Sequence, residues 1–103
     1  MRNREVIRRF TVEREGRAGN LCTNGKVIHS YNLVIGFNLS GNSYVIDYTS
    51  TGGHYKSQTT STHVNSLKRT SGVKTITVEE WEHMFKGLVY DVSVLLHGHH
   101  RST

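Results

Sequence analysis

Apolar and polar residues alternate along much of the first half of the chain, and a period of two predicts β-strands. Residues 6–13 alternate in this way and are expected to form a half-exposed strand, followed by a loop over residues 16–20. The pair Asn24-Gly25 tolerates positive φ at both positions, which predicts a tight hairpin turn. This turn would join residues 21–23 to a strand that starts at Lys26.

A second hairpin is expected further along the chain. The long segment 27–39 is rich in β-forming residues and places four apolar side chains on one face: Leu33, Ile35, Phe37 and Leu39. The polar stretch 40–43 turns the chain, and Tyr44, Ile46 and Tyr48 alternate on the way back. The glycine pair Gly52-Gly53 then ends the returning strand.

The pattern changes in the segment from Thr49 to His63, where eight of fifteen residues are Ser or Thr. Such a composition is typical of a loop or a weak edge strand. A hydroxyl cap at Thr60 or Ser61 predicts a short helix through Val64 and Leu67 that is closed by Gly72.

A second helix is predicted by a capping box, in which Thr77 supplies the hydroxyl and Glu80 the carboxylate three residues later. The apolar residues that follow share one helical face: Val78, Trp81, Phe85 and Leu88. Gly87 is expected to end this helix. Residues 88–96 are apolar on both faces of an extended chain, which predicts a last strand at the centre of the sheet.

The expected fold class is α+β, with a small, curved antiparallel sheet of about five strands and two short helices. The chain has 103 residues, which suffices for one core, so residues 1–96 are expected to form a single compact domain. Residues 97–103 would be a flexible, His-rich tail. Because the apolar fraction is only 35%, a homodimer that adds burial is a further expectation.

Cysteine content and hydropathy point to a reducing compartment, the cytoplasm of the cell or of a host cell. Cys22 is the one cysteine, which excludes an intrachain disulfide and a Cys-rich metal site. No apolar run is long enough to span a membrane, and the first residues lack the apolar stretch of a signal peptide. No membrane partner is expected.

Charge is distributed unevenly along the chain. Thirteen Lys and Arg against eight Asp and Glu give a net charge of +5. No acidic residue lies between Asp47 and Glu79, and a second basic cluster lies near the N-terminus. Such an asymmetry favours a polyanionic partner, although a basic surface also serves simply to keep a protein soluble.

The acid-free segment provides a candidate anion-binding site. Hydroxyl groups, amides at a helix start, and Lys or Arg side chains are the groups that contact phosphate oxygens. The candidate residues are Lys56, Ser57, Thr59, Thr60, Ser61, His63, Lys68 and Arg69, with Arg8 and Arg9 as more distant members. Tyr44, Tyr48 and Tyr55 could stack on unpaired bases. The alternative is an ordinary hydroxyl-capped turn with surface lysines.

Catalytic, cofactor and metal signatures are weak, so we expect a protein that is not an enzyme and binds no cofactor. Seven histidines are present, but a single Cys excludes the commonest zinc ligand sets. No Gly-rich phosphate loop is present. A small metal-independent nuclease using His54, His63 and Lys56 is the least favoured alternative. Cys22 with a histidine would need a third, orienting group.

The stretch Ser57-Gln58-Thr59-Thr60-Ser61-Thr62-His63 resembles an S-x-T-T-S-x-H motif of small proteins from phages and mobile elements. The resemblance covers about residues 25–70, including the hairpin-rich part and the basic pair Lys68-Arg69. In that family a Tyr usually precedes the first Ser directly, whereas Lys56 separates Tyr55 from Ser57 here. The resemblance implies a viral accessory protein and no particular activity.

These observations lead to a main hypothesis and an alternative of a different class. The first is a phage-type accessory protein that binds nucleic acid through a basic, Ser/Thr-rich surface. The alternative is a protein-binding inhibitor of a host or defence system, for example of a nuclease complex in the manner of an anti-CRISPR protein. The expected partner is therefore nucleic acid or a host protein that handles nucleic acid.

Overall fold

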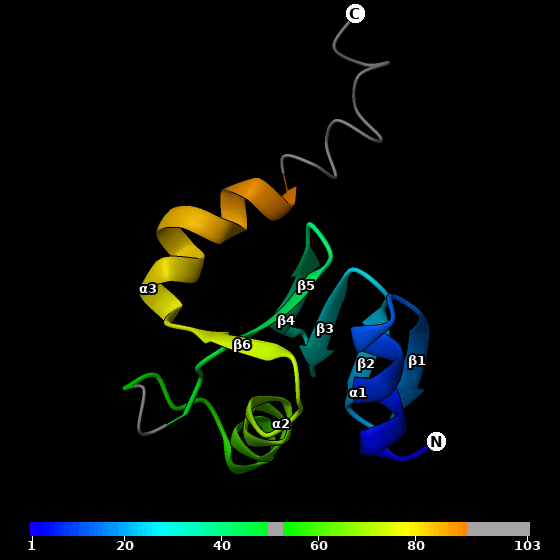
Figure 1. The fold of residues 1–103 in the computed structure, drawn as a ribbon. Helices are drawn as coiled ribbons and strands as arrows, with labels where there is room; N and C mark the ends of the chain where they lie inside the picture. The colour runs from blue at the N-terminus through cyan, green and yellow to red at the C-terminus, as the bar shows by residue number, and fades with distance from the viewer. Residues whose placement is uncertain (50–52, 91–103) are drawn as a thin grey trace, which may run out of the picture.

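The computed structural model describes residues 1–49 and 53–90. The elements in chain order are α1 (Asn3–Thr11), β1 (Glu15–Ala18), β2 (Leu21–Asn24), β3 (Val27–Ser30), β4 (Leu33–Leu39), β5 (Asn42–Ile46), α2 (Gln58–Lys68), β6 (Val73–Ile76) and α3 (Val78–Glu80) (Figure 1). After α3 the helix continues as the π-helical turn η1 (Trp81–Phe85) and then in α-helical form through residues 86–90. No helix in these two described ranges is long and apolar enough to cross a membrane.

The strands form one six-stranded sheet in the order β1-β2-β3-β4-β5-β6. The first five strands pair antiparallel with their neighbours, whereas β6 pairs parallel with β5. Figure 1 shows α1 and α2 on one side of the twisted sheet and the C-terminal helix on the other. The α+β prediction is confirmed; the sheet has six strands where about five were predicted, and it is mixed and not wholly antiparallel because β6 pairs parallel with β5.

The prediction of a strand over residues 6–13 is wrong, because these residues form most of α1. Val6, Ile7 and Phe10 lie at helical spacing and are at most 5% exposed, packed against the sheet. At the start of the helix, the Glu5 carboxylate accepts a hydrogen bond from the Arg2 backbone amide at 3.2 Å. An amphipathic helix therefore buries three side chains that a half-exposed strand would bury only in part.

The Asn24-Gly25 hairpin is confirmed between β2 and β3, which begins at Val27. Gly25 has a φ of +93°, and the Asn24 side-chain oxygen accepts hydrogen bonds from the backbone amides of Lys26 and Val27. The long predicted strand 27–39 is divided by a turn at Tyr31, whose φ is +58°. The 40–43 turn is confirmed, although its last two residues already belong to β5. The predicted loop 16–20 mostly belongs to β1.

Helix α2 begins earlier than the sequence predicted. Ser57 is the N-cap residue, and its hydroxyl accepts a hydrogen bond from the Thr60 amide at 3.1 Å. Thr60 itself cannot cap a helix here because its side chain is buried against β3. The helix ends at Lys68, and Gly72, with a φ of +85°, lies in the turn before β6.

The capping box at the start of α3 is confirmed, with hydrogen bonds of 2.8 and 3.0 Å between Thr77 and Glu80. The predicted end at Gly87 is wrong, because Val89 falls on the same helical face as Trp81 and is 1% exposed. Residues 88–90 are therefore helical and not part of a strand. The rest of the predicted last strand, the predicted tail 97–103 and Gly52 lie outside the described residues.

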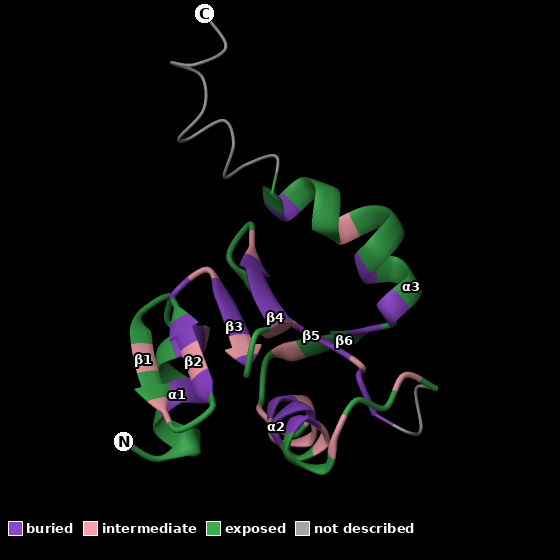
Figure 2. Cartoon of the chain, turned by 180° about the vertical axis from the view of Figure 1, so that it is seen from behind, coloured by how far each residue is buried: buried purple, intermediate pink, exposed green. Residues whose placement is uncertain are grey.

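Buried residues of the helices and the central strands form the core (Figure 2). On the α3 side of the sheet, the Phe37 ring stacks on Tyr44 and Trp81 with centroid distances of 4.9 and 5.1 Å. The Phe85 ring packs against Phe37 of β4 and Tyr44 of β5. On the other side, Phe10 of α1 lies over Gly36 of β4. This second contact positions α1, which carries Arg4, Arg8 and Arg9.

Candidate functional site

A cleft of about 360 Å³ lies between α1 and α2. The residues from α1 are spaced three or four apart, so they share one helical face, and the same is true of the residues at the end of α2. The lining consists of Arg4, Ile7, Arg8 and Thr11 from α1 and of Ser66, Arg69 and Thr70 from α2 and the turn after it.

Three arginine side chains line this cleft, and no acidic residue lines it with them. The side chains of Arg4, Arg8 and Arg69 make no hydrogen bond or ion pair with any residue in the ranges 1–49 and 53–90. Three like charges around one concave surface create a positive potential that attracts anions. Arginine is also the residue that best matches the geometry of phosphate oxygens.

The hydroxyl groups of the cleft have different roles. Thr11 and Thr70 donate their hydroxyl hydrogens to backbone carbonyls of Arg8 and Ser66, each at 2.8 Å, and so can only accept from a ligand. The Ser66 hydroxyl has no partner among the residues that the structure describes, and it can donate to an anion. Ile7 supplies a buried apolar part of the wall.

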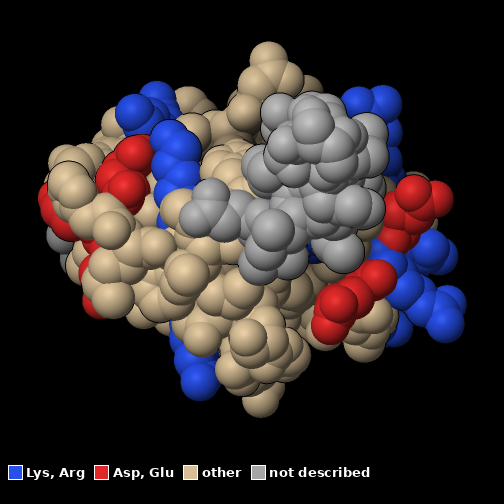
Figure 3. All heavy atoms as spheres, turned by 90° about the horizontal axis from the view of Figure 1, so that it is seen from above, with Lys and Arg blue, Asp and Glu red and all other residues tan. Residues whose placement is uncertain are grey.

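The basic character continues around α1. A second depression, of about 430 Å³, is lined by Glu5, Arg8, Arg9, Val12 and Arg14. Arg9 donates to the Glu15 carbonyl at 3.3 Å, which holds this side chain against β1. Figure 3 shows Lys and Arg on the side that carries α1 and β1, with acidic groups among them, and further Lys and Arg on the opposite side. The cleft is therefore one part of a wider basic surface.

The structure brings two of the candidate residues together in the cleft, Arg8 and Arg69, and places Arg9 beside it. Lys68 instead forms an ion pair with Asp47 at 3.3 Å. Ser57 caps α2, and Thr59 and Ser61 follow in its first turn. Because α2 has 11 residues, about 16 Å of helix separate this end from Arg69.

Thr60 and His63 are buried, with only 3% and 4% of their surface exposed. Both bind the Ser30 hydroxyl of β3, at 3.0 Å for Thr60 Oγ1 and 2.7 Å for His63 Nδ1. Within the described residues, every buried side-chain polar atom has a partner, so this network is fully satisfied. These two residues hold α2 on the sheet through the Ser30 hydroxyl.

Lys56, Ser57 and Thr60 line an open depression of about 430 Å³ beside the start of α2, whereas two of the three tyrosines pack against other side chains. Tyr48 is buried, and the Lys56 ammonium group lies 5.7 Å from its ring centroid. Tyr44 is stacked on Phe37. Tyr55, with 51% of its surface exposed, is the member of the predicted tyrosine set that could stack on a base.

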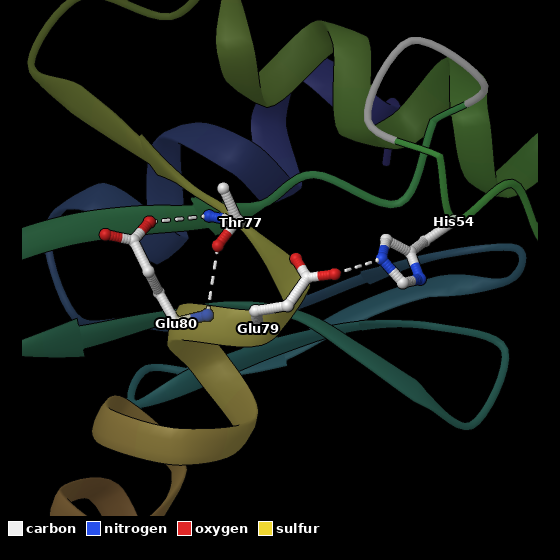
Figure 4. A network of polar contacts seen from close by, with 4 residues as sticks. All are labelled: His54, Thr77, Glu79 and Glu80. Atoms are coloured by element: carbon white, nitrogen blue, oxygen red, sulfur yellow. Dashed lines mark hydrogen bonds and ion pairs between the residues drawn. The ribbon is translucent and has the colours of Figure 1, made fainter.

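His54 and Glu79 connect the segment before α2 with the start of α3 (Figure 4). His54 Nε2 lies 2.8 Å from a Glu79 carboxylate oxygen, and this hydrogen bond lowers the pKa of Glu79. His54 is thus at the surface with an acidic partner, while His63 is buried beside Ser30. The nuclease alternative needs both histidines on one substrate, whereas His63 is 4% exposed and bound to Ser30, and His54 pairs with Glu79.

Cys22 lies 3.5 Å from His29 across the β2–β3 pair. No third group that would orient this histidine contacts it in the described part of the chain. In the same residues, no group of three or more His, Cys, Asp or Glu side chains could hold a metal ion.

The buried His63 predicts a loss of stability in mild acid. Burial lowers the pKa of His63 below its ordinary value of 6.5. The unfolded chain then binds a proton more readily than the folded chain, so stability is complete above about pH 6.5 and is lost as the pH falls below it. Urea unfolding followed by Trp81 fluorescence at pH 7.5 and 5.5 would measure this loss.

The control is His83→Gln, which changes an exposed histidine and should keep the same acid loss as the parent chain. His63→Asn should reduce the difference between the two pH values. The lowered pKa of Glu79 acts in a separate window, because its stabilisation is lost only as the pH falls below its ordinary 4.5. An equal acid loss in His63→Asn would contradict the assignment to His63.

Five lining residues were missed by the sequence analysis: Arg4, Ile7, Thr11, Ser66 and Thr70. The signal that could have found them is helical spacing, over positions 4, 7, 8 and 11 and again over 66, 69 and 70. That signal is lost when residues 6–13 are interpreted as a strand.

No family model, curated protein or solved structure matches this chain, so its resemblance to phage and mobile-element proteins stays a prediction.

Proposed function

We propose that this chain is a non-enzymatic binding protein that holds nucleic acid by its phosphates in the cleft between α1 and α2. The observation that carries the proposal is the group of three unpaired arginines, Arg4, Arg8 and Arg69, around one concave surface. Unneutralised arginines repel one another, and an anionic ligand removes that cost. Phosphate contacts supply most of the affinity in nucleic-acid binding that is not specific for sequence.

The surroundings of the cleft support the same proposal. The neighbouring depression adds Arg9 and Arg14, which could follow a backbone beyond the first phosphate. The net charge of +5 favours association with a polyanion over a wider range. The proposal differs from the sequence hypothesis in its location, since it moves the site from the Ser/Thr-rich start of α2 to the opposite end of that helix.

Salt dependence tests the proposal directly. Labelled single-stranded DNA and RNA and double-stranded DNA would be titrated with the protein between about 50 and 200 mM salt. We expect the logarithm of the affinity to fall linearly with the logarithm of the salt concentration, with a slope of about −0.7 for each phosphate contacted on a single strand. Binding that is absent, or that does not depend on salt, would refute the proposal.

A pair of charge-matched variants locates the binding surface. The cleft variant carries Arg4→Ala, Arg8→Ala and Arg69→Ala, and the control carries Lys26→Ala, Lys74→Ala and Lys86→Ala, so each loses three positive charges. The cleft variant should lose about tenfold or more in affinity at 150 mM salt and about two units of salt slope. The control should lose clearly less of both. Equal losses would show that only net charge matters.

The alternative, a protein-binding inhibitor, is favoured by a different feature of the surface. Met84, Leu88 and Tyr90 on the C-terminal helix expose 57%, 52% and 44% of their surface. Exposed apolar residues grouped on one helix are typical of protein contacts. A stoichiometric protein recovered from host lysate after nuclease treatment, with no retained nucleic-acid binding, would favour this alternative.

A further inference from the structure

The shape of the cleft limits what it can hold. It lies between two helices and has a volume of about 360 Å³, near the lower end of the range for small-ligand pockets. A protein reads a duplex by inserting a helix or strand into a groove, and so uses a protruding surface. Here the arginines line a recess, which instead accepts a group that protrudes from the ligand.

The charge of the cleft is larger than one backbone phosphate neutralises. An internal phosphodiester carries one negative charge, against three guanidinium groups at the cleft. A phosphomonoester carries about −1.5 to −2 at pH 7 and offers three terminal oxygens. Each arginine can then donate to its own oxygen, and the Ser66 hydroxyl adds a further donor. The phosphomonoester is therefore the better match in charge and in hydrogen-bonding groups.

We propose that the cleft recognises the terminal phosphate of a single-stranded nucleic acid. Arg4, Arg8 and Arg69 bind the phosphomonoester oxygens, and Ile7 lies against the sugar or base of the terminal nucleotide. The inference rests on the proposed nucleic-acid binding and adds the part of the ligand that is recognised. A 5′-phosphate and a 3′-phosphate share this chemistry, and the experiment below separates them.

The test uses one short oligonucleotide with an internal label in three forms, with a 5′-phosphate, with a 3′-phosphate and with hydroxyls at both ends. Fluorescence anisotropy at 150 mM salt should show that one phosphorylated form binds at least about tenfold more tightly than the hydroxyl form. Phosphatase treatment should remove the difference. The preference should be lost in the chain carrying Arg4→Ala and Arg69→Ala and kept in the chain carrying Lys26→Ala and Lys74→Ala.

The outcomes separate this inference from the proposed function. If the three forms bind equally, with salt-dependent affinity, end recognition is refuted and nucleic-acid binding stands. If no form binds, the proposed function fails, and end recognition of nucleic acid fails with it. A preference for a phosphorylated end that survives in the Arg4→Ala, Arg69→Ala chain would overturn the assignment to the cleft.

Discussion

Replacing Gly36 with alanine is expected to destabilise the fold by about 3 kcal/mol or more, because β4 has no room for a side chain at this position. A Cβ atom on Gly36 would lie 2.7 Å from the Tyr44 carbonyl oxygen and 2.8 Å from Ile28 Cγ2. It would also lie 3.4 Å from the Phe10 ring. The Tyr44 oxygen is backbone in the paired strand β5, so the clash is relieved only by shifting the sheet itself.

The matched control is Gly87→Ala. Gly87 lies in the C-terminal helix, and an added Cβ would meet nothing within 4 Å. Because alanine is the better helix former, this variant should be more stable by up to about 1 kcal/mol. Urea unfolding followed by Trp81 fluorescence would give both values. A loss of less than about 1 kcal/mol in Gly36→Ala would show that the sheet adapts easily.

The contact with Phe10 connects Gly36 to the proposed function. Phe10 is fully buried and belongs to α1, the helix that supplies Arg4 and Arg8 to the cleft. The absence of a side chain at Gly36 lets this ring approach the sheet closely. A Gly36→Ala chain that still folds should therefore bind nucleic acid more weakly, although the substitution removes no charge.

The elements predicted correctly are those with strong local signals. The Asn24-Gly25 turn needs positive φ, and the Thr77 and Glu80 capping box closes within four residues. Residues 6–13 carry two periods at once, since Val6, Phe10 and Val12 alternate while Val6, Ile7 and Phe10 lie at helical spacing. The sequence pattern does not choose between the two periods, and the burial of Val6, Ile7 and Phe10 against the sheet favours the helix.

Strand β6 is absent from the predicted elements, although three of its four residues, Val73, Thr75 and Ile76, are β-branched. Four residues are a short signal for a strand. The pairing of β6 with β5 comes from a distant part of the chain. The early start of α2 has a similar cause, because the Thr60 hydroxyl is hydrogen-bonded to Ser30, thirty residues earlier in the sequence.

The sequence predicts that the candidate site is basic, but not which basic residues come together to form it. The basic cluster near the N-terminus and the basic pair at Lys68-Arg69 are visible in the sequence. They meet only because α1 and α2 pack against the same side of the sheet, which brings Arg8 and Arg69 to one cleft. The Ser/Thr-rich motif was predicted to form the site, but two of its residues, Thr60 and His63, attach α2 to β3.

Replacing Asn38 with leucine should cost about 3 kcal/mol, since the side chain satisfies three buried polar groups at once. Asn38 is 6% exposed. Its amide group donates to the Phe10 carbonyl at 2.7 Å and to the Gly25 carbonyl at 2.9 Å, and its carbonyl oxygen accepts from the Ser43 hydroxyl. Leucine has a similar size but leaves these three groups without this partner. Urea unfolding measures the loss.

The second readout concerns α1, because Phe10 lies in its last turn and its carbonyl accepts hydrogen bonds from the Asn38 side chain and from the Glu13 amide. Amide hydrogen exchange in α1 should therefore accelerate in Asn38→Leu more than exchange in β4 and β5.

Ser43→Ala is the control, as it removes one of the three bonds and should cost about 1 kcal/mol. Combined with Asn38→Leu, it should add little, since its partner is already gone. Full additivity, or unchanged exchange in α1, would show that Asn38 does not attach α1 to the sheet. The arginines of the cleft depend on that attachment for their position, so the same variant should also weaken nucleic-acid binding.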